Sequence, residues 1–414
     1  MTLSWGGGVS EQRKIRVAVV FGGRSTEHAV SCIGAGRVFA AMDPDRYEVV
    51  PIGITRAGQW VLTDGNPARL AIKAGQLPSV EAVALPLAKT AGEQHDAAPE
   101  VPGDANAATH GLDTARRDMP GLIVTGPGQV PQILADVDVV LPLLHGAYGE
   151  DGTIQGLLEL AGIRYAGAGV LASAASMDKE YAKMIFRSHG LPTGPYVIVR
   201  DSDWGPAPSP CPGPSAVVQR KRVLDEIADL GWPVFVKPAR GGSSIGTSKA
   251  SGTAELHEAI EAARQHDRKV IVEAAIDGLE VECGVLEGVD GGPPDTSVPG
   301  QIRVSGGQEF YDFEAKYLDA ATDVVIPAPI PQERAGQIRQ LAAAAFEAMS
   351  CEGLARVDFF CTPDGRVIVN EINTMPGLTP TSAFPLMWEA TGVPLPQLVD
   401  RILRTALRRP PGLR

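Results

Sequence analysis

Apolar positions near the start of the chain follow the order of a strand, a helix and a second strand. The run RVAVVF at 16–21 is typical of a short buried strand, and it leads into a Gly-rich turn at 22–28. We predict a helix over 28–42 and a strand over 47–54, an order that is typical of a parallel α/β sheet. The turn lacks the GxGxxG spacing of a dinucleotide site, so the alternative is a substrate-binding turn at the carboxyl end of a strand.

A second apolar run has the same form. VDVVLPLL at 137–144 predicts another buried strand, which ends at His145 within HGAYGEDG, and we predict a helix over 153–161. A single His is usually structural, but the flanking glycines and acid pair make His145 a candidate site residue. Glu27, in the first turn, is placed either to meet a ligand ammonium or to satisfy the dipole of the helix that follows. We expect the first domain to close near residue 167.

Two long segments lack clear periodicity. Residues 64–118 are rich in Ala, Pro and Gly, and we expect a variable excursion on the surface. Residues 201–221 contain five prolines and are expected to form a loop insertion. The first 14 residues are expected to be a loose leader.

The second half of the chain contains a Gly/Ser-rich loop between two predicted strands. FVKPARGGSSIG at 235–246 offers several backbone N–H groups and two hydroxyls, which suits phosphate oxygens. Lys237 precedes the loop and favours that function over a flexible hairpin. Glu280 is placed either to bond ribose hydroxyls or to lie solvated on a strand. We predict helices over 172–188, 253–265, 331–350, 382–391 and 395–408 and strands over 269–273 and 278–286.

The stretch from 353 to 377 predicts a hairpin with one polar face. Its strands are RVDFFC at 356–361 and VIVNEIN at 367–373, and TPDG between them has turn chemistry. A turn centred on 363–364 would set Arg356 opposite Glu371 and Asp358 opposite Val369. Arg356, Asp358, Glu371 and Asn373 would then share one face, opposite an apolar flank of Val357, Phe359, Ile368 and Ile372. Two carboxylates and an amide oxygen are ligands that Mg²⁺ takes, usually together with substrate phosphates.

Composition narrows the possible partners. A net charge of −12 and an isoelectric point near 5.1 argue against nucleic acid or an anionic membrane as the main partner. No apolar run reaches the length of a membrane span. The five cysteines are scattered without zinc-ligand spacing, which favours a reducing cytoplasm.

Seven motifs occur in order along the chain: GGRSTEHAVS, LHGAYGEDGTIQG, YAGAGVLASAASMDK, FVKPARGGSSIG, YDFEAKY, RVDFF and NEINTMPGLTPTS. On these motifs the chain resembles the D-alanine–D-alanine ligases of the ATP-grasp superfamily. The resemblance covers most of the chain, apart from the leader and the stretches near 64–118 and 201–221. It implies an α/β chain, α+β in its C-terminal part, with an ATP-grasp fold. A Rossmann-like N-terminal domain is expected over 1–167, a central ATP-grasp subdomain over 168–276 and a C-terminal subdomain over 277–414.

The resemblance also implies an activity. The family joins two D-alanines while hydrolysing ATP to ADP, through a D-alanyl phosphate that the amine of the second D-alanine attacks. ATP is expected as co-substrate, with two Mg²⁺ ions, for which Mn²⁺ substitutes, and a monovalent cation. A cytoplasmic homodimer serving peptidoglycan synthesis is implied, with no nucleic acid or membrane as partner.

Family roles carry over to matching positions. The resemblance places the metal on Asp358, Glu371 and Asn373, ATP phosphates on Lys179, Lys237 and Ser244, adenine on Glu273 and the backbone to Ile276, and ribose on Glu280. It places the first D-alanine at Glu27 and His145, the acyl phosphate at Arg356, and the transferred phosphate and second substrate near Lys316, Gly377 and Ser382. Ser243, Tyr317 and Glu27 would form a triad linking a loop over roughly 305–323 to the N-terminal domain.

Two alternatives remain at this point. One is another ATP-grasp carboxylate–amine ligase, including an enzyme that makes D-Ala–D-lactate; Tyr317 argues against it, because such relatives lack this Tyr. The other is a non-catalytic nucleotide-binding module, which would be expected to have lost the metal ligands Asp358, Glu371 and Asn373 that this chain retains.

Overall fold

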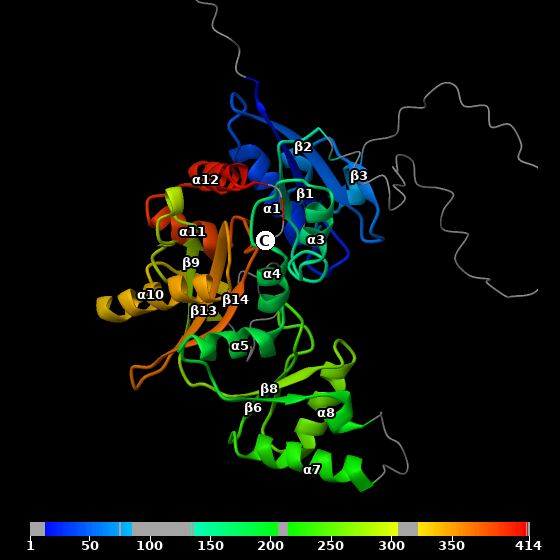
Figure 1. Ribbon diagram of the computed structural model, residues 1–414, viewed down its shortest axis with the longest axis vertical. Helices are drawn as coiled ribbons and strands as arrows, with labels where there is room; N and C mark the ends of the chain where they lie inside the picture. Colours follow the sequence, from blue (N-terminus) through cyan, green and yellow to red (C-terminus); the bar gives the residue numbers. More distant parts are fainter. Residues whose placement is uncertain are drawn as a thin grey trace, which may run out of the picture.

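Three β-sheets, one above another in Figure 1, organise the chain. This computed structural model describes residues 13–73, 76–84, 134, 136–205, 214–304, 322–410 and 412. Lys316, Tyr317, Cys211, most of the leader and the greater part of the 305–323 loop lie outside the described residues. Among the described residues, no helix is long and apolar enough to cross a membrane.

The first sheet has the predicted parallel core. Its order is β3-β2-β1-β4, with β1 parallel to both β2 and β4 and β3 antiparallel at the edge. Its elements are β1 (Ile15–Gly22), α1 (His28–Ala41), β2 (Tyr47–Ile54), β3 (Trp60–Leu62), β4 (Val139–Leu143) and α3 (Thr153–Leu160). The side chains of β1 alternate between two buried faces, one of which packs against α3. The other packs against α1 and, from the far end of the chain, α12 (Leu395–Arg408).

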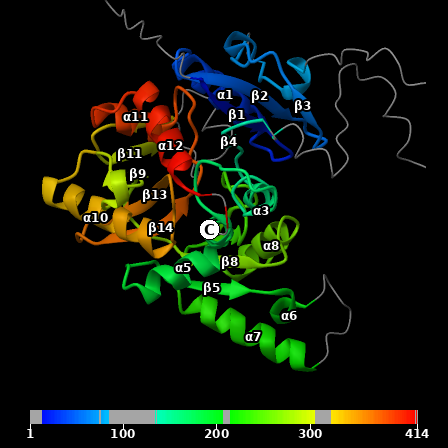
Figure 2. The same ribbon diagram turned by 45° about the horizontal axis from the view of Figure 1, so that its top comes forward.

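The second and third sheets are antiparallel. The second has the order β12-β11-β9-β13-β14, and β10 pairs with β9; the third has the order β5-β8-β6-β7. The second contains β9 (Leu279–Leu286), β10 (Asp295–Thr296), β11 (Gly300–Val304), β12 (Thr322–Val325), β13 (Leu354–Cys361) and β14 (Val367–Asn373). The third contains β5 (Tyr196–Val199), β6 (Val234–Pro238), β7 (Ser248–Ala250) and β8 (Val270–Ala274). Figure 2 shows β5 and β8 of the third sheet side by side, with α7 below them.

Helices cover the apolar faces of these two sheets. One core cluster joins α10 (Gln332–Ala348), α5 (Lys179–Ser188) and α4 (Val170–Met177) to the second sheet. Another joins α6 (Asp201–Trp204), α7 (Pro214–Ala228) and α8 (Thr253–Arg264) to the third. The short helix α11 (Ala383–Ala390) precedes α12. Helix α11 also packs on part of the other face of the second sheet, beside β9 and β11. The rest of that face, and one face of the third sheet, remain free to approach a ligand.

Two expectations about irregular segments were wrong where the structure describes them. The start of the 64–118 segment is not a surface excursion, because Leu70, Val80 and Val83 are buried in the core beside β1. The backbone N–H of Val80 donates to Nε2 of the buried His28 at 3.1 Å. Much of 201–221 is helical, in α6 and the first half of α7, rather than a loop. The prolines were taken as loop signals, but Pro214 occupies the first position of α7, where a proline does not disturb the helix.

The predicted hairpin is present, but its register was wrong by two residues. Arg356 pairs with Asn373 and Asp358 with Glu371. One residue of the shift comes from a longer turn, in which Gly365 adopts a left-handed φ of 97°. The other comes from a bulge in the pairing between Asp358 and Phe359, which leaves Asn370 as the extra residue.

These two shifts restore the predicted polar face, since a slip of two residues returns each side chain to the same side. Arg356, Asp358, Glu371 and Asn373 project from one face of β13 and β14. The apolar flank changes in one place. Val369, which is fully buried opposite Phe359, joins the core cluster in place of the predicted Ile368.

Candidate active site

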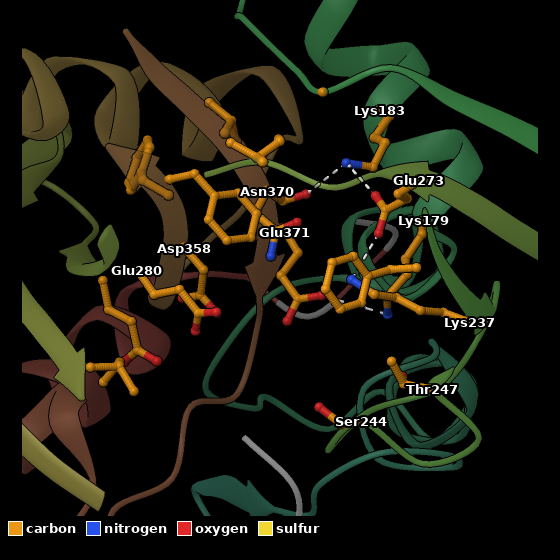
Figure 3. A pocket seen from close by; sticks show the side chains of 18 of the residues that line it. Lys179, Lys183, Lys237, Ser244, Thr247, Glu273, Glu280, Asp358, Asn370 and Glu371 are labelled. Atoms are coloured by element: carbon orange, nitrogen blue, oxygen red, sulfur yellow. Dashed lines mark hydrogen bonds and ion pairs between the residues drawn. The ribbon is translucent and has the colours of Figure 1, made fainter. Parts of the chain in front are cut away.

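A cleft of about 300 Å³ lies between the free faces of the second and third sheets. Ten of the predicted site residues line it: Lys179, Lys237, Ser243, Ser244, Glu273, Ile276, Glu280, Arg356, Asp358 and Glu371. Glu27, His145, Asn373, Gly377 and Ser382 do not line this cleft. Figure 3 shows lysines and a glutamate on one side of the cleft facing Asp358 and Glu371 across it.

The loop between β6 and β7 has a strained backbone. Ser243 and Ser244 adopt left-handed φ angles of 50° and 56°, and Gly246 adopts 71°. Non-glycine residues rarely take this conformation, and they do so mainly where the surrounding structure enforces it, often at a functional site. The loop lines the cleft, and a turn of this composition can present backbone N–H groups to an anion.

Three lysines and one glutamate form the wall below this loop. Glu273 on β8 lies 2.8 Å from Nζ of Lys237 and 2.8 Å from Nζ of Lys183. Burial works against the charge of Glu273, but these two ammonium groups hold its pKa well below the usual range. Burial likewise opposes the charge of Lys237, yet the neighbouring Glu273 raises its pKa. Lys237 is therefore kept charged in a largely buried site.

Lys183 is a site residue that the sequence analysis missed. It lies on α5 one turn after Lys179, so that both side chains reach the cleft from the same helix face. Its Nζ also donates to the carbonyl oxygen of Asn370, the bulged residue, at 3.3 Å. The spacing KEYAK was the signal that could have found it.

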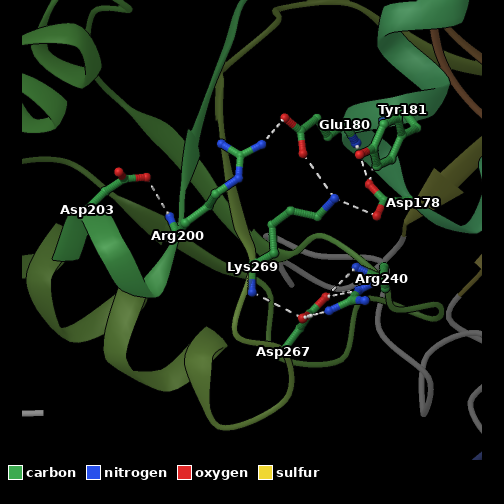
Figure 4. A network of polar contacts seen from close by, with 8 residues as sticks. All are labelled: Asp178, Glu180, Tyr181, Arg200, Asp203, Arg240, Asp267 and Lys269. Atoms are coloured by element: carbon green, nitrogen blue, oxygen red, sulfur yellow. Dashed lines mark hydrogen bonds and ion pairs between the residues drawn. The ribbon is translucent and has the colours of Figure 1, made fainter. Parts of the chain in front are cut away.

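A network of ion pairs holds the start of α5 against the Gly/Ser loop (Figure 4). Lys269 contacts Asp178 at 2.5 Å and Glu180 at 3.0 Å, and Arg240 pairs with Asp267 through two nitrogens, at 2.6 and 2.9 Å. Asp178 also caps α5 by accepting from the backbone N–H of Glu180.

This anchoring fixes Lys179 at the loop. The backbone N–H of Lys179 donates to the carbonyl of Ala239, and its Nζ donates to the carbonyl of Gly241 at 2.7 Å. The same Nζ lies 3.6 Å from Oε2 of Glu371 across the cleft. Lys179 thus connects the loop to the opposite, acidic wall.

The acidic wall is built on three neighbouring strands. The pairing of β9, β13 and β14 sets Glu282, Asp358 and Glu371 in one row. Both oxygens of Asp358 accept from Arg356, at 2.7 Å from Nε and 2.7 Å from Nη2. Burial opposes the charge of Arg356, but Asp358 and Glu282 raise its pKa further. Glu282 is a second residue that the sequence analysis missed, although it follows Glu280 at the period of a strand.

Residues from the first sheet meet the cleft at its edge. Glu27 does not cap α1 with its side chain; instead its Oε1 accepts a hydrogen bond from Oγ of Ser243 at 2.5 Å. This contact joins the turn after β1 to the Gly/Ser loop and forms two members of the predicted triad. The third, Tyr317, lies outside the described residues.

His145 and Glu150 hold the chain that follows β14. Nδ1 of His145 lies 2.9 Å from the carbonyl oxygen of Met375, and Glu150 accepts from the backbone N–H groups of Gly146 and Met375. Burial, reinforced by the charge of Glu27, raises the pKa of Glu150 to about 8. Asn373 accepts from the same Met375 N–H at 3.1 Å. His145 is therefore buried against the segment that follows β14, the strand of Glu371 and Asn373, rather than exposed in the cleft.

Gly377 and Ser382 belong to the segment between β14 and α11, outside the lining of the cleft. Ser382 accepts from the backbone N–H of Thr379 at 3.1 Å. Arg37 of α1 donates to the carbonyl of Thr379 at 2.6 Å. This segment is consequently held on the first sheet's helix.

Comparison with known proteins gives one family over nearly the whole chain. Residues 16–168 match the family model described as D-ala D-ala ligase N-terminus, and residues 185–404 match D-ala D-ala ligase C-terminus. A D-alanine–D-alanine ligase of Streptomyces coelicolor is 51% identical over 399 residues, covering 96% of this chain and 95% of that protein.

Solved structures agree. VanG D-Ala:D-Ser ligase from Enterococcus faecalis has a TM-score of 0.72 at 31% identity, covering 95% of this chain and 100% of the other. The D-alanine–D-alanine ligase from Coxiella burnetii has a TM-score of 0.66 at 30% identity, covering 95% and 94%. These likenesses confirm the predicted α/β ATP-grasp fold. The chain belongs to the D-alanine–D-alanine ligase family of ATP-dependent, ADP-forming ligases.

Proposed function

We propose that this protein joins two D-alanine molecules to D-alanyl-D-alanine with ATP, in the cytoplasm, for peptidoglycan precursors. The observation that carries the proposal is the cleft, in which a strained Gly/Ser loop and three lysines face a row of carboxylates. Phosphoryl transfer depends on positioning and charge neutralisation, and these are the groups it needs. We also propose the domain boundaries 1–167, 168–276 and 277–414, which place one sheet in each of the first two units and the β9–β14 sheet in the third.

The phosphates of ATP are assigned to the lysine side of the cleft. Lys179 and Lys237, with Lys183 behind them, would neutralise phosphate charge, while Ser244 and the loop backbone would cover it. Glu273 would keep the lysines in place, and the backbone from there to Ile276 would meet adenine. Glu280 would bond the ribose.

Two Mg²⁺ ions fit the acidic wall, and Mn²⁺ is expected to substitute. Asp358 and Glu371 lie opposite one another and supply hard oxygen donors, and Asn373 ends the same strand. Within the described ranges no three His, Cys, Asp or Glu side chains form a metal cage. A site completed by phosphate oxygens and water suits this set, and bound Mg²⁺ would neutralise the β- and γ-phosphates. A monovalent cation and a homodimer are expected on the family resemblance alone.

The amino acid substrates are assigned to the edge near the first sheet. Glu27, held by Ser243, would accept the ammonium of the first D-alanine, and His145 would lie by its carboxylate. Arg356 would stabilise negative charge on the acyl phosphate. Lys316, Gly377 and Ser382 are proposed around the transferred phosphate and the second substrate, and Tyr317 would complete the triad.

The test is an ADP-release assay with D-Ala alone and with D-Ala plus D-Ser, D-lactate or L-Ala. We expect D-Ala alone to support full turnover and L-Ala to support none. The likeness to a D-Ala:D-Ser ligase makes D-Ser the informative competitor. Preferential formation of D-Ala–D-Ser or D-Ala–D-lactate would refute the assignment of the second substrate. No ADP release with any of these compounds would favour a non-catalytic module.

A further inference from the structure

Arg356 has two carboxylate partners that differ in strength. Asp358 accepts two hydrogen bonds from it, whereas Oε2 of Glu282 lies 3.1 Å from Nε as an ion-pair partner. Nε carries a single hydrogen, which it donates to Asp358. Glu282 therefore contacts the same edge of the guanidinium as an ion-pair partner without accepting that hydrogen bond. The side chains of Arg356 and Glu282 are only 9% and 7% exposed, and that of Asp358 is 16% exposed.

The pair between Arg356 and Asp358 conflicts with metal binding. A bidentate guanidinium occupies both oxygens of Asp358, which is also the proposed ligand of a divalent cation. A divalent cation on Asp358 would place its two positive charges beside the charge of Arg356, and a site of low dielectric makes their repulsion strong. The hold of Asp358 on Arg356 must therefore weaken when the metal enters.

A buried guanidinium that loses its partner is costly. Removing one member of a buried ion pair strongly destabilises a protein, because the remaining charge stays uncompensated. Glu282 lies in the same row of the sheet as Asp358 and already faces Arg356. It is thus the carboxylate within reach when Asp358 turns to the metal.

We propose that Glu282 is a positioning residue that holds Arg356 at the cleft when a divalent cation takes Asp358. Arg356 then shifts its hydrogen bonds from Asp358 to Glu282 without leaving the wall. Glu282 acts through Arg356 and touches neither substrate nor metal. The inference rests on the proposed function in one respect, the assignment of a divalent cation to Asp358.

The experiment measures how strongly Mn²⁺ tightens ADP binding to the full-length protein. The dissociation constant of ADP is measured by calorimetry in EDTA and in saturating Mn²⁺, and their ratio is the metal enhancement. In Glu282→Gln we expect ADP binding in EDTA to stay within about twofold of wild type. The metal enhancement is expected to fall about tenfold, because Arg356 then lacks its ion pair with Glu282. Glu226→Gln, which removes one exposed carboxylate of α7, is the control and should change neither value.

Two further variants separate the explanations. In an Arg356→Gln background, Glu282→Gln should have no added effect on the enhancement, since its action runs through Arg356. An equal loss in both backgrounds would make Glu282 a metal ligand and overturn the inference. So would a Glu282→Gln enhancement equal to wild type. Asp358→Asn should abolish the enhancement; an enhancement that persists would refute the proposed metal site, and the role of Glu282 would fall with it. Circular dichroism checks that each variant is folded, and Arg356→Lys replaces Arg356→Gln if that protein does not fold.

Discussion

Two clusters of charged side chains lie near the cleft, and they balance differently. In the network of Figure 4, Lys269, Arg200 and Arg240 form ion pairs with Asp178, Glu180 and Asp267, while the fourth carboxylate, Asp203, accepts from the backbone N–H of Arg200. Across the cleft, by contrast, five carboxylates outnumber four cations: Glu273, Glu280, Glu282, Asp358 and Glu371 face Lys179, Lys183, Lys237 and Arg356. The three ion-paired cations and their carboxylate partners form a self-contained group, called the brace below. At the cleft, the excess of carboxylates favours the binding of an added cation, as expected at a site of chemistry.

Removing a charge from the acidic wall should have the largest effect of the changes considered, and the quantity affected should be turnover. Glu371→Ala is expected to lower ADP release with D-Ala by about 1000-fold, since the metal loses a proposed ligand. The free energy of unfolding should stay the same or rise slightly, because like charges on the wall are relieved. Urea denaturation alongside the kinetic assay checks both. Near-wild-type turnover would contradict the metal assignment.

Removing a charge from the brace should lower stability more than turnover, the reverse of the effect expected for Glu371→Ala. Lys269→Met leaves Asp178 and Glu180 facing each other without their cation, and we expect about 3 kcal/mol lower stability to urea. Turnover of the protein that remains folded should change far less than in Glu371→Ala. Lys269→Arg, which keeps the charge, is the control. A Lys269→Met protein as stable as wild type would remove the distinction between the two clusters.

Glu150 offers a third kind of buried carboxylate, bound mainly by backbone N–H groups. The unfolded chain releases its proton near pH 4.5, but the folded protein keeps it until its pKa of about 8. Between these values the folded state binds the extra proton, so stability should fall as pH rises, by about 3.5 kcal/mol from pH 5 to pH 8. Glu150→Gln should flatten this slope in urea titrations at several pH values. Parallel slopes for the two proteins would show that Glu150 does not carry the proton.

Breaking an exposed ion pair should have the smallest effect on stability, which serves as a baseline for the buried pairs. Lys221 and Asp225 on α7 lie 3.0 Å apart with side chains 77% and 65% exposed. Lys221→Ala should change stability by less than about 0.5 kcal/mol, because water screens the pair. A loss comparable to that of Lys269→Met would mean that burial does not set the difference between these contacts.

Local patterns predicted the helices and strands well, and the errors have physical causes. The hairpin register depended on a bulge at Asn370 and on the left-handed Gly365, neither of which alternation of polar and apolar residues can reveal. The polar face survived because the two errors added to an even number. The helical part of 201–221 was missed because prolines were taken as loop signals without regard to position in a helix.

In the candidate site, too, local motifs predicted some residues, whereas contacts between distant parts of the chain determine the others. Motif order placed ten residues that line the cleft, but contacts across the chain were not predictable. Glu282 matters only because β9 pairs with β13, and Lys183 only because α5 places it against Glu273 of β8. His145 was predicted as a site residue, but no pattern within the sequence indicates that Met375 would accept its hydrogen bond.

The packing of α12 on the first sheet has a consequence for biosynthesis. Val17 and Val19 of β1 share one core cluster with Leu398, Ile402 and other residues of the last helix. A ribosome makes these segments almost 400 residues apart, so part of one sheet face lacks its partner until α12 has been made. The sheet that contains β1 is therefore completed only after both other sheets have been made, and a chain truncated before α12 exposes apolar surface on that sheet rather than at its broken end.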